Sequence, residues 1–316
     1  MKACLPYVWP AIGLGAVLFS GWLLFRELHG LSLSQVEDAF TAISGRRWVV
    51  AVAFTLVAYM ALAWYDRIAL LHLGFKLSWT FISAVSFTTY ALSHNIGMSM
   101  FSGAMVRYRA YSTRGLTIAD VGLLVAFCSF TFFLGTLLLG GIVLVTVPSI
   151  VERLFDLNVT VARAVGVVML VAVAAYVAGS AMHFRPLVLG PFKLVYPRFG
   201  ITLRQLMAGP LELMGAAGII YCALPVDYNP GYLVVLGVFL ASFSAALLSH
   251  APGGIGVLEY VFVKALSDVS DGIPKADVIA ALLVFRLLYL IAPLAFGIVA
   301  VVLFERSRIV KSPGPD

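Results

Sequence analysis

Glu259 and Arg286 carry opposite charges and lie in stretches of sequence that are otherwise apolar. In lipid, an unpaired charge at the centre of a helix costs about 2.5–3.5 kcal/mol, so we expect these residues, and Lys264 nearby, to have partners or water. A Glu259–Arg286 pair could simply hold two helices together, or it could line a cavity in which Arg286 attracts an anionic head group. Glu212, a third acid in apolar surroundings, could belong to such a site or lie at a helix end.

Arg107, Tyr108, Arg109 and Tyr111 form a basic and aromatic motif. Two arginines separated by one residue could clamp a phosphodiester through several planar N–H donors. Tyrosines suit the interfacial region of a membrane. The alternative is an ordinary basic flank that only sets the orientation of the chain.

Residues 93–97 (SHNIG) and 250–254 (HAPGG) interrupt two apolar regions. Proline removes a backbone donor and glycine weakens a helix, so backbone amides are freed there. Those amides must face protein or a wet cavity, where they suit a phosphate; the alternative is a packing kink. The two histidines could titrate with pH or could simply be hydrogen-bonded in the bundle. The residues assigned to the breaks are His94, Asn95, His250, Pro252, Gly253, Gly254 and Gly256.

The composition is typical of a membrane protein. Of the 316 residues, 62% are hydrophobic and 11% are charged, whereas soluble domains carry roughly 45–50% and 25%. A soluble enzyme and a disordered chain are therefore excluded. The net charge of +6 suits loops that touch an anionic leaflet. Because the basic residues are scattered between apolar segments, we expect no nucleic-acid partner.

A spanning helix needs about 20 apolar residues. This criterion predicts an all-α polytopic integral membrane protein with six full transmembrane helices and a short interfacial helix at 31–43. The interrupted regions cover residues 77–106 and 230–266. The predicted spans are residues 7–25, 48–71, 118–147, 161–182, 206–225 and 277–304.

Lysine and arginine in short loops indicate the cytoplasmic side of a membrane protein. Segment 183–204 has four basic residues and no acid, whereas segment 268–277 has three aspartates and one lysine. The charges agree with one topology if both interrupted regions are re-entrant hairpins that enter from opposite sides, with both termini cytoplasmic. The alternative is that the first arm of the second hairpin crosses fully.

An internal repeat connects the two breaks. Residues 92–97 (LSHNIG) and 248–253 (LSHAPG) match at four of six positions, at an offset of 156. Oppositely directed hairpins related in this way indicate an inverted repeat with a transport site near the membrane midplane. We expect one transmembrane domain, 1–316, with repeat halves near 48–147 and 206–304; the alternative is a coincidental match.

No pattern for catalysis occurs in the sequence. HExxH, GxSxG, a phosphate loop and an acid-rich metal cluster are all missing. The three cysteines form no CxxC pair and are expected to be buried free thiols. We therefore expect a protein that is not an enzyme and that uses no metal or cofactor.

Three ordered motifs resemble the N-terminal flippase domain of the lysylphosphatidylglycerol synthase/flippase family (multiple peptide resistance factor) and its standalone relatives. They are SGAMVRYRAYS at 102–112 followed by RGL, HAPGGIGVLE at 250–259, and ALLVFRLLY at 281–289. Asp66, which its neighbours suggest is an interfacial cap or pair, also fits the family. Bifunctional members carry a soluble aminoacyl-transferase domain, whereas this sequence ends soon after its last predicted span, so aminoacylation is not expected.

The resemblance implies a flippase or scramblase in the bacterial cytoplasmic (inner) membrane. Its substrate would be an anionic or aminoacylated phospholipid, such as phosphatidylglycerol or lysylphosphatidylglycerol. Two alternatives stay open: an ion-coupled carrier of a small solute that uses Glu259, His94 or His250, and a non-transporting scaffold for a lipid-synthesis enzyme. Membrane phospholipids are the expected partners, and a second copy of the chain and a lipid-synthesis enzyme are further candidates.

Overall fold

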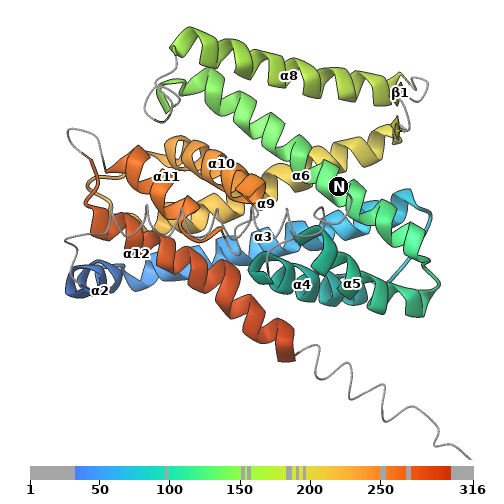
Figure 1. The fold of residues 1–316 in the computed structure, drawn as a ribbon, viewed down its shortest axis with the longest axis horizontal. Helices are drawn as coiled ribbons and strands as arrows, with labels where there is room; N and C mark the ends of the chain where they lie inside the picture. Colours follow the sequence, from blue (N-terminus) through green and yellow to red (C-terminus); the bar gives the residue numbers. More distant parts are fainter. Residues whose placement is uncertain are drawn as a thin grey trace, which may run out of the picture.

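The computed structural model is a bundle of long helices whose connections lie at two ends (Figure 1). The predicted first span, 7–25, lies outside the residues that the structure describes, as do His250, Pro252 and Gly253. The described residues are 33–96, 99–150, 154, 158–182, 187–189, 192–194, 197–249, 254–267 and 272–299.

Within these residues, six helical segments are long and apolar enough to cross a membrane. One of them, α10 (Tyr232–Ser249), belongs to a region that the sequence assigned to the second hairpin. The prediction of a polytopic helical membrane protein is confirmed. The five segments that coincide with predicted spans are α3 (Gly45–His72), α6 (Ile118–Thr146), α8 (Val159–Ala181), α9 (Phe199–Ala223) and Lys275–Val299.

Each interrupted region contains two consecutive helices. In the first, α4 (Trp79–Ile96) is followed by α5 (Ser99–Tyr111); in the second, α10 is followed by α11 (Val257–Leu266). The helices of each pair pack against one another. In Figure 1, α4 and α5 lie toward the end of the bundle where α3 ends, and α10 and α11 lie toward the opposite end. Their re-entry into the membrane and their inverted-repeat relation remain predictions.

The shorter elements lie at the ends of the bundle. Helix α2 (Leu33–Thr41) falls within the predicted interfacial helix and packs against α12 (Lys275–Phe285). A single 3₁₀ turn, η1 (Ser112–Arg114), follows α5. Strands β1 (Leu187–Leu189) and β2 (Phe192–Leu194) pair antiparallel in the basic segment 183–204. This small hairpin departs from the all-α prediction.

Helix α9 lies at the centre and is the most buried of the six candidate spans. It packs closely against α3 and α6 because small residues line both contacts. A Cβ on Gly215 would meet the carbonyl oxygen of Phe54 at 2.9 Å, and a Cβ on Gly135 would meet the backbone of Gly209 at 2.6 Å. Small residues at such contacts let helices approach one another in lipid, where hydrophobic burial does not drive their association.

Candidate functional site

A buried ion pair joins α3 to α5. Arg107 donates from Nε to Asp66 Oδ2 at 3.1 Å and from a terminal nitrogen to Oδ1 at 2.7 Å. Tyr111 donates to Oδ2 at 2.9 Å, and Cys128 of α6 lies 3.6 Å from Oδ1. The guanidinium also lies 4.8 Å from the ring centre of Tyr90. Because Asp66 is 0% and Arg107 is 4% exposed, both charges are sealed from lipid and solvent.

The predicted two-arginine clamp is not formed in this arrangement. Residues i and i+2 of an α-helix lie about 200° apart around its axis. Arg107 therefore faces α3, whereas Arg109 and Tyr108 are exposed. Of the two interfacial roles predicted for Asp66, cap or pair, the structure has a pair, but a completely buried one whose partner lies 41 positions away. The motif thus has a buried part, Arg107 and Tyr111, and an exposed part, Tyr108 and Arg109.

Glu212 lies in the middle of α9 and is 2% exposed, so its predicted alternative, a helix-end carboxylate, is excluded. Tyr289 donates to its Oε1 at 2.5 Å, and the Tyr65 hydroxyl lies 3.5 Å from its Oε2. Tyr59 donates to the backbone carbonyl of Tyr289 at 2.9 Å. Buried polar groups need hydrogen-bond partners. Two of these tyrosines supply them for Glu212 and the third for a backbone carbonyl, and together they join α9, α3 and the helical turns after α12.

The helix after α12 continues as a π-helix, η3 (Arg286–Ile291). Its hydrogen bonds run over five residues instead of four, and such turns occur frequently at functional sites. The carbonyl of Leu290 accepts a hydrogen bond from Asn95 Nδ2 at 3.1 Å. His94 stacks on Tyr289 with ring centres 5.3 Å apart. The end of α4, where the first break begins, is therefore fastened to this π-helix.

Arg286, the first residue of η3, pairs with Glu259 of α11, which confirms the predicted pair. Its Nε donates to Glu259 Oε1 at 2.7 Å, and a terminal nitrogen lies 2.6 Å from the same oxygen. The other carboxylate oxygen accepts the N–H of Gly256 at 2.8 Å. Gly254 and Gly256 have φ angles of +64° and +83°, a region that glycine adopts readily. These two glycines shape the turn that presents a backbone donor to Glu259.

Both broken regions therefore meet the same stretch of chain, the end of α12 and η3. A continuous series of contacts also links the two ion pairs. It runs from Arg107 to Tyr90, from Tyr90 to His94 at 5.5 Å, and from His94 through Tyr289 to Phe285 at 5.1 Å. Phe285 directly precedes the arginine of the second pair. The polar interior is thus one connected region rather than scattered side chains.

Four tyrosines for which the sequence predicted no site role belong to this region: Tyr59, Tyr65, Tyr90 and Tyr289. Their signal was available, because a hydroxyl inside an apolar helix needs a polar partner and so indicates a polar interior. Lys264, which the sequence singled out, donates to a backbone carbonyl at 3.2 Å and takes no part in the cluster. Among the described residues, no group of three or more ligating side chains could hold a metal ion.

An apolar helical bundle that encloses two ion pairs and a buried carboxylate defines a multi-pass membrane protein with a polar interior. The model of a family described as "Lysylphosphatidylglycerol synthase TM region" matches residues 11–297. The chain belongs to this family. The match covers the described helices and both breaks.

The chain is similar in sequence to three relatives, which differ in how much of their own length it covers. The Synechocystis sp. "Uncharacterized protein slr0712" is 29% identical over 96% of this chain and 94% of its own length. "Inner membrane protein YbhN" of Escherichia coli is 33% identical over 81% of this chain and 79% of its own length. "Phosphatidylglycerol lysyltransferase" of Staphylococcus haemolyticus is 25% identical over 95% of this chain but 34% of its own length. The protein is a multi-pass protein of the bacterial inner membrane.

Proposed function

We propose that the chain moves phospholipid head groups across the cytoplasmic membrane as a flippase or scramblase. The observation that carries this proposal is the meeting of both broken regions at η3, where Arg286 and Glu259 form a buried ion pair. An anionic or aminoacylated lipid, such as phosphatidylglycerol or lysylphosphatidylglycerol, fits the description of the family. It also fits the name of the staphylococcal relative.

Two short helices support a pair of re-entrant hairpins. Helix α5 has 13 residues and α11 has 10. At 1.5 Å per residue they are about 20 and 15 Å long, which is less than the roughly 30 Å of the hydrocarbon core. A second arm that is too short to cross as a straight helix fits a hairpin that returns to its own side, and paired broken helices are typical of inverted-repeat transporters. The proposed domain covers 1–316, with repeat halves at 48–147 and 206–304 and both termini cytoplasmic.

The second ion pair has the features that a head-group site needs. The side chains of Arg286 and Glu259 are 14% and 9% exposed, so this pair is less completely enclosed than the Asp66–Arg107 pair. Glu259 keeps its hydrogen bond from Gly256 when Arg286 turns away, so the carboxylate is not left without a donor. A lipid phosphate can then accept hydrogen bonds from the planar donors of Arg286.

Movement of a head group breaks no covalent bond of the lipid, so the proposed activity involves no acyl transfer. The chain corresponds to 34% of the length of the staphylococcal lysyltransferase, and the family description names a transmembrane region. Lysyl transfer is therefore outside the proposal. A lipid-synthesis enzyme fits the proposed function as a partner, because the lipid that is moved must be made in the same membrane. A second copy of the chain is the other proposed partner.

One observation favours a second candidate, an ion-coupled carrier of a small solute. His94, which is partly buried, and Glu212, which is buried, are titratable side chains that both contact Tyr289. Such a carrier would take up its solute in response to a pH gradient and would leave lipid distribution unchanged. A scaffold for a lipid-synthesis enzyme would move neither the solute nor the lipid. Neutralising the charges of its ion pairs would leave its function intact.

Reconstitution into liposomes tests the proposal. We expect fluorescent phosphatidylglycerol to become accessible to an external quencher faster than in protein-free vesicles, and more slowly with Arg286→Gln. The matched control is Arg163→Gln, which removes an exposed arginine from the first turns of α8 and should leave the rate unchanged. A rate equal to that of protein-free vesicles would contradict lipid movement. Equal rates for wild type and Arg286→Gln would remove Arg286 from the site.

A further inference from the structure

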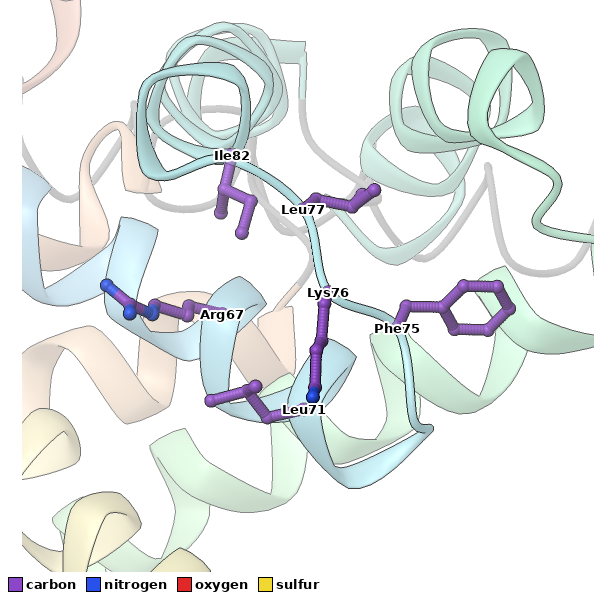
Figure 2. A pocket seen from close by; sticks show the side chains of 6 residues that line it. All are labelled: Arg67, Leu71, Phe75, Lys76, Leu77 and Ile82. Carbon is purple, nitrogen blue, oxygen red and sulfur yellow. The ribbon is translucent and has the colours of Figure 1, made fainter.

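A cavity of about 250 Å³ lies at the corner between the end of α3 and the start of α4 (Figure 2). It belongs to neither ion pair. Figure 2 shows Lys76 extending from the connecting segment toward Leu71 of α3. The cavity combines apolar walls with two cations. Its lining residues are Arg67, Leu71, Phe75, Lys76, Leu77 and Ile82.

The charge at this corner is positive and unbalanced. Arg67 and Lys76 are exposed, and neither forms an ion pair with a carboxylate in the described part of the chain. The aspartate that precedes Arg67 is buried and paired with an arginine of α5. Aromatic rings hold the neighbouring cations in place. The Arg67 guanidinium lies 5.0 Å from the ring centre of Trp79, and that of Arg114 lies 5.0 Å from the ring centre of Phe81.

We propose that this corner cavity binds an anionic phospholipid, with the phosphate at Arg67 and Lys76 and the first part of an acyl chain against the apolar walls. Charge complementarity selects the anion, because basic residues beside a membrane attract anionic lipids. The apolar walls select a lipid over a free phosphate, which has nothing to place against Leu71 and Ile82. Trp79 marks the interfacial depth at which head groups lie. The site is independent of the proposed transport, because it uses neither break and does not involve Arg286.

Native mass spectrometry of the purified full chain in neutral detergent tests this site. We expect phosphatidylglycerol to bind more tightly than phosphatidylcholine. Arg67→Gln with Lys76→Gln should weaken phosphatidylglycerol binding about 10- to 30-fold, since each cation near a membrane surface contributes about 1 kcal/mol. The matched control is Arg46→Gln with Arg163→Gln. It removes the same charge from exposed arginines at the starts of α3 and α8 and should leave binding unchanged.

Two further measurements test whether binding needs the cavity as well as its two cations, and whether the ligand is a phospholipid or free phosphate. Leu71→Trp fills the cavity and keeps both cations, so it should also weaken phosphatidylglycerol binding, whereas Lys76→Arg should retain it. Unchanged affinity in the double glutamine variant, or an equal loss in the control, would overturn the site. Inorganic phosphate that displaces the lipid at equal concentration would overturn the assignment to a phospholipid.

Discussion

The two buried arginine–carboxylate pairs of this protein differ in what surrounds them. In the Asp66–Arg107 pair the side chains are 0% and 5% exposed, and a tyrosine hydroxyl adds a further donor. In the Glu259–Arg286 pair they are 9% and 14% exposed, and one carboxylate oxygen is held by the backbone of a helix break. The first pair lies against regular helices, and the second lies at a π-helix and a glycine turn.

From this difference we infer different roles for the two pairs. A sealed pair with all its partners supplied by the protein is costly to break, because removing one charge leaves the other buried and uncompensated. A pair at irregular backbone, with one partner that remains when the other moves, is suited to exchange ligands. Residue type alone does not distinguish them, because both consist of an arginine and a carboxylate.

The largest expected effect is at the sealed pair. Asp66→Asn leaves Arg107 buried without its counter-charge, and we expect it to destabilise the protein by about 3–5 kcal/mol. Unfolding in detergent, followed by circular dichroism, measures this loss. Asp227→Asn, which removes an exposed carboxylate between α9 and α10, is the control for a lost carboxylate. A loss below about 1 kcal/mol would mean that the Asp66–Arg107 pair does not hold α3 and α5 together.

Tyr289→Phe should have an intermediate effect. It removes the 2.5 Å hydrogen bond to Glu212 and leaves a buried carboxylate oxygen without that donor. The expected destabilisation is about 1–3 kcal/mol, measured in the same unfolding experiment. Tyr228→Phe removes an exposed hydroxyl and should be neutral. If Tyr289→Phe and Tyr228→Phe behaved alike, the carboxylate would have to find another donor.

Asn95→Leu tests the link between the first break and the π-helix. The variant loses the donor to the Leu290 carbonyl, at an expected cost of about 1 kcal/mol. Because that bond fastens α4 to η3, hydrogen exchange of η3 should also become faster. Exchange rates equal to those of the wild type would show that η3 is held by other contacts.

The smallest effect is expected at Arg109. It is exposed on the far side of α5 from Asp66, so Arg109→Lys should change stability by less than about 0.5 kcal/mol. Arg107→Lys, which keeps the charge but loses the planar two-point contact, should be clearly worse. Equal losses of stability in Arg107→Lys and Arg109→Lys would show that the two arginines act together.

The sequence predicts most of the spans because runs of about 20 apolar residues have few alternatives. It also predicts the Glu259–Arg286 pair, since a buried charge needs a partner and these are conspicuous in apolar surroundings. It does not identify Arg107 as the partner of Asp66, because that choice depends on how α5 packs against α3. The π-helix could not be predicted from the sequence either. Its carbonyls accept hydrogen bonds from side chains of α3 and α4, which depend on how the helices pack.

We propose that Glu259 and Arg286 act directly on the lipid head group. The most direct test of this role is lipid movement by the double variant Glu259→Gln with Arg286→Gln, reconstituted at matched amounts of folded protein. Removing both charges avoids an uncompensated one, so the variant should be more stable than either single variant. We expect lipid movement to stay lost nevertheless, because the head group has no arginine to bind. Transport restored to the wild-type rate in the double variant would make this pair a structural one, like Asp66 and Arg107, and would contradict a direct role in lipid movement.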